Sequence, residues 1–197
     1  DDLIELHLAP FVAGLEAGAA SVMAAFNAVN RLPMHANAPL IEGWLRGKQG
    51  FDGLVVSDYT GVQELSPHGL GTPRTVVARA LHAGIDMDMV GEDYLRELPG
   101  LAAEGVDAPE CDLAFTAAEI EQLIDRACGR VLDFKARLGL LDDPYHGLEG
   151  TVAAPPRSEG RALARRAAAA ACVLLKNDQM LPLRAPCDVA LMGPFAE

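Results

Sequence analysis

Three short apolar segments, separated by helix-forming stretches, constrain the fold of this chain more than any other feature. They lie at residues 21–26, 53–58 and 85–89, and they begin about one βαβ unit apart. The middle segment shows no alternation of apolar and polar residues before Ser57, which is typical of a strand covered on both faces. The pattern predicts parallel strands joined by right-handed crossovers, and therefore an α/β fold.

Helix signals occupy the intervals around these segments. Residues 2–17 are expected to form a helix that Pro10 kinks, because proline has no N–H for the helical hydrogen-bond ladder. Residues 104–113, which are acidic and contain a proline, are expected to form a loop. Three further helices are expected, each opening at a residue whose side chain can cap the first turn: Asn37, Thr72 and Thr116.

The residues that follow the last of these helices indicate a change of domain. Residues 143–160 are rich in proline, glycine and aspartate, as linkers often are. An alanine-rich helix is expected from about Ser158, and residues 188–194 are expected to form a strand. The chain is therefore predicted to be a fragment with part of one α/β domain at 1–142, a linker at 143–160 and the start of a second domain at 161–197.

The charge of the chain limits its partners. The sequence has 28 acidic and 16 basic residues, which give a formal net charge of −12. A nucleic-acid backbone or an anionic membrane requires a basic surface, so neither is an expected partner. No apolar run approaches the roughly 20 residues of a membrane span. A neutral ligand such as a small carbohydrate fits this charge best, while no oligomeric state follows from it.

The cysteines do not predict a metal site. Cys111, Cys128, Cys172 and Cys187 show no CxxC spacing and have no histidine at the spacing of a zinc motif. Cys128 and Cys172 lie in helix-forming stretches and are expected to be buried thiols. No metal and no cofactor is predicted.

Asp58 is the strongest candidate for a functional side chain. Parallel α/β domains place their chemistry at the carboxyl ends of the strands, and Asp58 directly follows an apolar strand segment. A strand end fixes the backbone, so it holds a carboxylate more firmly than a loop does. The alternative is that Asp58 caps the segment after the strand.

Other polar residues near the strand ends are weaker candidates. Asp86 and Asp88 share one face of their strand, where hydrogen-bonding or structural roles are favoured over acid–base chemistry. Glu64 lies six positions after Asp58, and the two side chains would diverge if that segment is helical. His68 could act as a general acid, although a loop histidine without a visible partner is more typical of the surface.

Several motifs resemble glycoside hydrolase family 3. Residues 50–59, GFDGLVVSDY, resemble the motif that carries its nucleophile. Residues 21–30, SVMAAFNAVN, and residues 83–89, AGIDMDM, look like two of its strands. Residues 138–145, LGLLDDPY, resemble the end of its barrel domain, and residues 173–183 resemble the beginning of its second domain. The motifs follow the family's order over nearly the whole chain.

The resemblance implies a fold and a reaction. The chain would hold the C-terminal part of a (β/α)8 TIM-like barrel, followed by the start of an α/β sandwich domain. The reaction would be hydrolysis of terminal β-linked sugars, of β-glucosidase or β-xylosidase type, with retention of configuration. Asp58 would be the nucleophile, and the acid/base residue would lie beyond residue 197. The 197 residues alone are therefore expected to be inactive.

The resemblance also implies a sugar-binding role for Tyr59, Phe26 and Met23. Tyr59 stands where the family usually has tryptophan, so it would offer the sugar a smaller aromatic wall. Phe26 stands where the family usually has a tyrosine whose hydroxyl approaches the nucleophile, so one hydrogen bond to Asp58 would be missing. Met23 matches a residue that lines the pocket, although a core role suits methionine equally.

Two rival functions remain open. A β-N-acetylhexosaminidase of the same superfamily is expected to carry a second aspartate after the nucleophile, where this chain has Tyr59. A non-catalytic sugar-binding relative is disfavoured by the intact motif around Asp58 and weakly favoured by Phe26. Resemblance to bacterial periplasmic β-glucosidases implies a periplasmic or extracellular location.

Overall fold

The computed structural model describes residues 2–145, 147, 157–183, 186–190 and 192–193. By their internal contacts the residues form two units, Asp1–His146 and Gly147–Glu197. No helix in the described ranges is long and apolar enough to cross a membrane.

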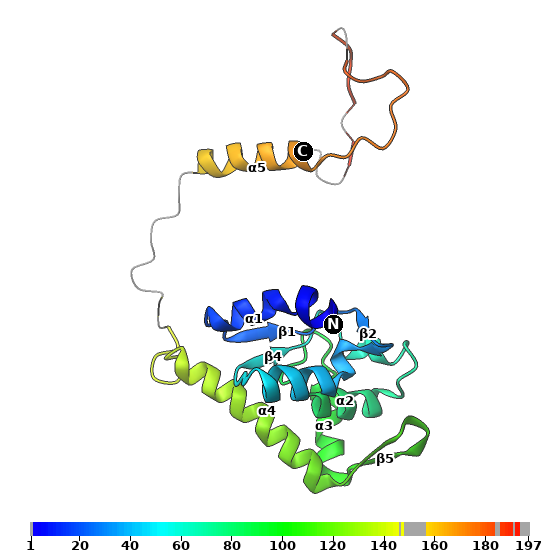
Figure 1. The fold of residues 1–197 in the computed structure, drawn as a ribbon, viewed down its shortest axis with the longest axis vertical. Coiled ribbons are helices and arrows are strands. Elements are labelled where there is room, and N and C mark those ends of the chain that lie inside the picture. The colour runs from blue at the N-terminus through cyan, green and yellow to red at the C-terminus, as the bar shows by residue number, and fades with distance from the viewer. Residues whose placement is uncertain (1, 146, 148–156, 184–185, 191, 194–197) are drawn as a thin grey trace. The chain divides into compact units, whose positions relative to one another are not determined.

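Parallel strands lie at the centre of the first unit (Figure 1). Strand β1 (Ser21–Met23) pairs in parallel with β4 (Leu54–Val56). A single parallel bridge joins Val56 to Met87, where a third strand was predicted over residues 85–89. The α/β fold and the parallel pairing are confirmed, but the third strand is reduced to this bridge. The bridge still brings all three predicted segments together in the order β1, β4, Met87.

Pro10 divides the first helix. The predicted helix at 2–17 consists of a π-helix, η1 (Leu3–His7), and an α-helix, α1 (Ala9–Glu16), with a break between them. Because proline cannot donate a backbone hydrogen bond, the ladder is interrupted just where Pro10 enters the first turn of α1. The expected kink is confirmed as a change of helix type.

Side-chain caps are present at the start of the three other helices predicted in the first unit. The Asn37 side-chain oxygen accepts the N–H of Leu40 at 3.1 Å, at the beginning of the π-helix η3 (Pro39–Lys48). Thr72 caps α2 (Pro73–Ala83).

The helix α4 (Ala117–Arg137) shows the complete capping box. The Thr116 hydroxyl accepts the N–H of Glu119, and the Glu119 carboxylate accepts the N–H of Thr116 in return. This exchange satisfies donors that would otherwise lack partners at the start of the helix. The first turn of α4 is thus fixed by residues adjacent in sequence, which explains why its position could be predicted.

Residues 93–115 differ from the prediction. Residues 104–113 were expected to form a loop, but they contain strand β5 (Val106–Ala108) and a 3-10 turn, η5 (Pro109–Cys111). β5 pairs in antiparallel fashion with β6 (Leu113–Phe115). Strands of three residues are too short to show a period in the sequence. The helix α3 (Asp93–Glu104), which tolerates an internal Pro99, was also not predicted.

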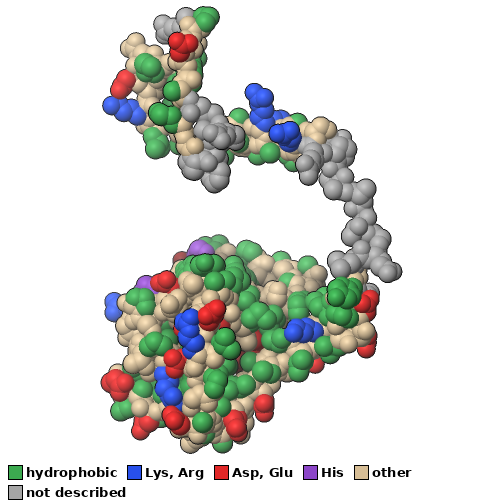
Figure 2. Space-filling view, turned by 180° about the vertical axis from the view of Figure 1, so that it is seen from behind, with side chains coloured by type: hydrophobic (Ala, Val, Ile, Leu, Met, Phe, Trp, Pro, Cys, Tyr) green, Lys and Arg blue, Asp and Glu red, His purple; other side chains and the backbone are tan. Residues whose placement is uncertain are grey.

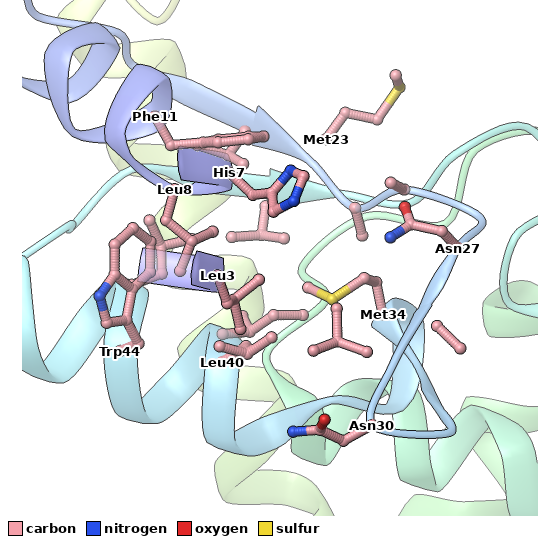
Figure 3. Close-up of a pocket in the computed structure, with 18 residues that line it drawn as sticks. Leu3, His7, Leu8, Phe11, Met23, Asn27, Asn30, Met34, Leu40 and Trp44 are labelled. Carbon is pink, nitrogen blue, oxygen red and sulfur yellow. The ribbon is translucent and has the colours of Figure 1, made fainter. Parts of the chain in front are cut away.

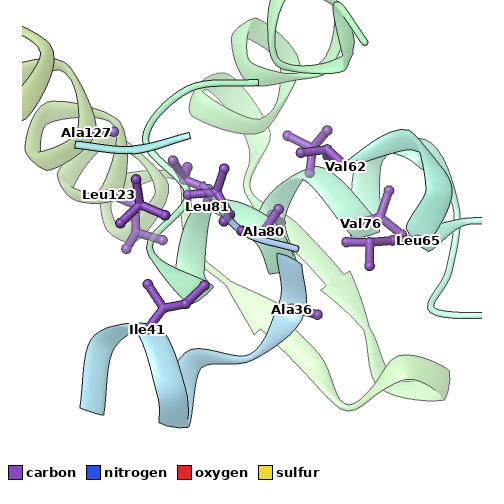
Figure 4. Packing of buried hydrophobic residues seen from close by; sticks show 14 of the residues in the cluster. Ala36, Ile41, Val62, Leu65, Val76, Ala80, Leu81, Leu123 and Ala127 are labelled. Carbon is purple, nitrogen blue, oxygen red and sulfur yellow. The ribbon is translucent and has the colours of Figure 1, made fainter. Parts of the chain in front are cut away.

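The core of the first unit is built around α2. Figure 4 shows Val76, Ala80 and Leu81 of this helix among the buried side chains. Val76 and Ala80 are fully buried. Neighbouring elements contribute further apolar side chains to the same cluster: Ala36, Ile41, Val55, Val62, Leu65, Ile120, Leu123 and Ala127. Val55 of β4 belongs to this cluster, so close packing against α2 and its neighbours holds the strand in place.

A short hairpin follows β1. Strands β2 (Ala28–Val29) and β3 (Leu32–Pro33) pair in antiparallel fashion, and the two residues between them, Asn30 and Arg31, have φ values of 52° and 68°. Two-residue hairpin turns of this kind favour Asn-Gly, because both positions need positive φ. Arg31 therefore occupies a conformation that suits glycine.

Arg31→Gly is expected to raise the free energy of unfolding by about 1 kcal/mol. The left-handed conformation costs a residue with a Cβ about 1–2 kcal/mol, and the greater freedom of glycine in the unfolded chain cancels part of the gain. Urea unfolding of both proteins measures the difference. Arg31→Ala is the control, since it removes the side chain but keeps the Cβ. Equal stability of the Gly and Ala variants would contradict the prediction.

The second unit contains one described helix, α5 (Arg157–Ala171). The alanine-rich helix predicted from about Ser158 is confirmed. Within 172–183, 186–190 and 192–193 no helix or strand forms. The strand predicted at 188–194 is therefore wrong for its described residues, since a strand requires a pairing partner and none pairs there. Leu191 and Pro194 lie outside the described residues, as does most of the predicted linker.

Candidate active site

The backbone beyond β4 is fixed by a buried hydroxyl. Ser57 is fully buried, and its hydroxyl accepts the N–H of Met89 at 2.7 Å while donating to the Asp58 carbonyl at 2.9 Å. The N–H of Ser57 donates to the Met87 carbonyl at 2.9 Å. Two adjacent strand segments are thus tied together directly before Asp58.

Asp58 begins a tight turn. Its carbonyl accepts the N–H of Gly61 at 2.9 Å, and its carboxylate accepts the N–H of Tyr59 at 2.8 Å. The N–H of Thr60 donates to the Met89 carbonyl at 2.9 Å. The next helical turn, η4 (Gln63–Leu65), has no side-chain cap. Asp58 therefore caps no helix, although its carboxylate accepts the first N–H of the segment that follows the strand.

The Asp58 carboxylate has no counter-ion. It is half-buried, and in the part of the chain that the structure describes no lysine, arginine or histidine forms an ion pair with it. A carboxylate without a salt bridge retains its nucleophilic oxygen for a ligand. This is the chemistry that a strand-end nucleophile needs.

A histidine that the sequence did not point to contacts the Asp58 backbone. The N–H of Asp58 donates to Nε2 of His35 at 2.9 Å. His35 lies in the 3-10 turn η2 (Met34–Ala36), and only 2% of its surface is exposed. Burial lowers the pKa of His35, while the negative charges of Asp58 and Asp88 act in the opposite direction. The distance of 23 residues from Asp58 leaves no local signal for this contact.

The lowered pKa of His35 predicts a pH dependence of stability. The folded protein binds the proton less tightly than the unfolded chain, whose histidine has the usual pKa of 6.5. The neutral imidazole therefore stabilises the fold above pH 6.5, and this contribution is lost as the pH falls through the folded-state pKa. We expect wild type to lose stability below pH 6.5 relative to His35→Gln, measured by urea unfolding. Parallel curves for the two proteins would contradict this.

The other three predicted site residues are exposed near the strand ends. Exposed fractions are 59% for Tyr59, 52% for Phe26 and 51% for Met23. Met23 ends β1 and is paired in register with Val56. The Phe26 ring lies 6.0 Å from the His35 ring, centroid to centroid. Phe26 therefore neighbours the histidine that accepts the N–H of Asp58.

Asp86 is a structural residue. Its carboxylate accepts hydrogen bonds from Arg46 at 2.6 Å, from the N–H of Val55 at 2.8 Å and from Arg130 at 2.8 Å. Only 1% of its side chain is exposed. Both carboxylate oxygens are engaged, so Asp86 is not free for a substrate. The predicted hydrogen-bonding role of Asp86 is confirmed.

Asp88 anchors the start of α3. Its Oδ2 accepts the N–H groups of Asp93 at 2.9 Å and Tyr94 at 3.4 Å, which are among the first free donors of that helix. Burial, with the nearby charge of Asp88, raises the pKa of Asp93. Glu64 and His68 are exposed, as expected for surface residues.

The described cysteines and acidic residues form no metal site. Within the described ranges no group of three or more histidine, cysteine or acidic side chains could hold an ion. The cysteines are free thiols, and Cys128 and Cys172 are exposed. The prediction that these two are buried is wrong. Cys128 lies on the exposed side of α4, and helix formation alone does not bury a side chain.

An apolar cavity of about 540 Å³ lies beside β1 and η3 (Figure 3). Leu3, Phe11, Met34 and Trp44 are among its lining residues, whereas Asp58 and Tyr59 are not. Met23 also lines the cavity, although Figure 3 shows its side chain directed away from Leu3 and Met34. We therefore locate the candidate site at the ends of β1 and β4, and not in this cavity.

The surface of the first unit agrees with a neutral ligand. Figure 2 shows acidic and basic side chains interspersed with apolar ones on the face it presents, with no continuous basic area there. A nucleic-acid backbone would require such an area.

Comparisons with known proteins identify the family to which the chain is similar. Residues 1–132 match the N-terminal domain of glycosyl hydrolase family 3. The chain is 36% identical to a periplasmic beta-glucosidase of Salmonella typhimurium, covering 97% of this chain and 24% of that protein. It is 32% identical to a putative beta-xylosidase of Formosa agariphila, covering 99% of this chain and 25% of that protein. The chain spans about a quarter of the length of these relatives.

A solved structure shows the same fold. The structure of a beta-glucosidase from Listeria innocua in complex with glucose is 35% identical and superposes with a TM-score of 0.69. The match covers 83% of this chain and 21% of the Listeria protein.

Proposed function

Since this chain belongs to glycosyl hydrolase family 3, we propose that it takes part in hydrolysing terminal β-linked glucose or xylose units, with Asp58 as the nucleophile. The observation that carries the proposal is the position of Asp58, a half-buried carboxylate at the carboxyl end of β4 that has no counter-ion among the described residues. The fixed turn that begins at Asp58 supports it, because a nucleophile must be held in one orientation.

The proposed reaction has two steps. An Asp58 carboxylate oxygen attacks the anomeric carbon while a second carboxyl group protonates the departing glycosidic oxygen, which gives a glycosyl ester on Asp58. The second group then takes a proton from water, which attacks the same carbon, breaks the ester and releases the sugar with its original configuration. Retention places the two carboxyl groups about 5–5.5 Å apart.

We propose that residues outside these 197 complete the site. The proposal is supported by the share of the relatives that the chain spans, about a quarter. The first unit would then be part of a (β/α)8 barrel, and the second would begin an α/β sandwich. The acid/base residue would belong to the residues beyond these units, so residues 1–197 alone should show no turnover.

Tyr59, Phe26 and Met23 are proposed to contact the sugar. Aromatic rings pack well against the C–H faces of a pyranose, and Tyr59 follows Asp58 directly. The exposure of all three side chains near the strand ends supports this role. The name of the Salmonella relative supports a periplasmic or extracellular location.

The proposal is tested with the full-length protein and nitrophenyl β-glycosides. Hydrolysis of the β-glucoside or β-xyloside is expected, and proton NMR of the first product should show the β-anomer. First formation of the α-anomer would exclude a nucleophilic Asp58. Absence of turnover on both substrates, with sugar binding retained, would favour the non-catalytic alternative.

A further inference from the structure

The contact between His35 and Asp58 fixes the protonation state of the imidazole. Because the Asp58 N–H is a donor, Nε2 of His35 must carry a lone pair, and the ring proton must be on Nδ1. The ring is buried, so water does not compete for Nε2. The hydrogen bond therefore fixes the orientation of the peptide group that precedes the Asp58 Cα.

Gly61 provides the space for this imidazole. A Cβ added to Gly61 would lie 2.1 Å from Nε2 and 2.5 Å from Cε1 of His35, far inside van der Waals contact. The backbone of Gly61 does not require glycine, since it is not among the described positive-φ residues. Any side chain at position 61 would therefore displace the His35 ring.

The two residues hold the Asp58 turn at both ends. His35 accepts the N–H of Asp58, and the N–H of Gly61 donates to the Asp58 carbonyl at 2.9 Å. The peptide groups on both sides of the Asp58 Cα are thereby fixed. Rotation of either group would move the carboxylate, which otherwise holds only the adjacent N–H of Tyr59.

We propose that His35 is a positioning residue for Asp58, and that it acts as a neutral hydrogen-bond acceptor seated against Gly61. The inference rests on the proposed function, in which Asp58 is the nucleophile. It adds a residue that does not touch the substrate but determines where the attacking oxygen lies. A displacement of about 1 Å in a reacting group can lower a rate by about 100-fold.

Three variants of the full-length protein separate positioning from simple packing. His35→Leu removes the acceptor and keeps an apolar side chain of similar size. His35→Gln keeps an acceptor at about the reach of Nε2. Gly61→Ala leaves the histidine intact but forces its ring to move. His82 is an exposed histidine on α2, and His82→Leu is the matched control.

The readouts are kcat and KM on a nitrophenyl β-glycoside, and the rate of labelling by a 2-deoxy-2-fluoro glycoside. For His35→Leu and Gly61→Ala we expect both kcat and the labelling rate to fall by about 10- to 100-fold, with KM changed less than about threefold. His35→Gln should recover kcat to within a few-fold of wild type. His82→Leu should equal wild type.

Failure of the inference and failure of the proposed function give different results. If wild type is labelled on Asp58 and His35→Leu is labelled equally fast, the positioning role is wrong. A loss that His35→Gln does not recover would also overturn it, as packing alone would explain that result. If His35→Leu does not fold, Gly61→Ala decides by the same criteria. Label on a residue other than Asp58 in wild type would instead overturn the proposed function, and this inference with it.

Discussion

Asp58→Gly in the full-length protein is expected to lower kcat by about 10⁴-fold or more without disturbing the fold. The effect is large because the covalent step has no substitute when the nucleophile is removed. The fold should survive, since within the described part of the chain the Asp58 side chain accepts a hydrogen bond only from the N–H of Tyr59. Steady-state kinetics and circular dichroism measure the two parts of the prediction.

Azide provides a positive control for this variant. A small anion can enter the space left by the carboxylate and attack the anomeric carbon, so azide should restore turnover and yield a glycosyl azide of inverted configuration. Asp88→Gly should show no such rescue, because Asp88 anchors the start of α3. An Asp58→Gly variant with more than about a tenth of wild-type kcat would contradict the assignment.

Asp86→Leu is expected to lower the free energy of unfolding by about 3–5 kcal/mol. Asp86 is the buried partner of Arg46, whose side chain is 7% exposed, and of Arg130. Removal of the shared carboxylate leaves the buried Arg46 charge with the more distant Glu42 carboxylate at 3.4 Å, and it leaves the N–H of Val55 without its acceptor. This is more costly than losing the attraction alone. Urea unfolding at pH 7 measures the change.

Two further variants show whether the buried charge is responsible. Adding Arg46→Met to Asp86→Leu removes the buried Arg46 charge and should recover part of the lost stability. Asp52→Ala breaks an exposed ion pair with Arg137 and should leave the unfolding curve nearly unchanged. If Asp86→Leu and Asp52→Ala have similar effects, the buried-charge explanation is wrong.

The features that could be predicted from the sequence depend on neighbouring residues. The caps at Asn37, Thr72 and Thr116 satisfy donors three residues later, so the sequence alone determines them. The strand end at Asp58 was found for the same reason, since an unbroken apolar run leads into it. The Pro10 break follows from a missing N–H.

The features that could not be predicted depend on contacts distant in sequence. Asp86 meets Arg46 and Arg130 across 40 and 44 residues, and His35 meets Asp58 across 23. Nothing in a single sequence marks these pairs, because each residue has an ordinary local context. The hairpin of β5 and β6 was missed because its strands are too short for a periodic pattern.

The central claim is that Asp58 becomes covalently bound to the sugar, and trapping of the intermediate tests it most directly. Wild-type full-length protein should be inactivated by a 2-deoxy-2-fluoro-β-glycoside with a good leaving group. The fluorine slows both formation and hydrolysis of the ester, and the good leaving group speeds only its formation, so the ester accumulates. Mass spectrometry of the digested protein should place one sugar adduct on Asp58. An adduct on another residue, such as Glu64 or Asp88, would contradict the account.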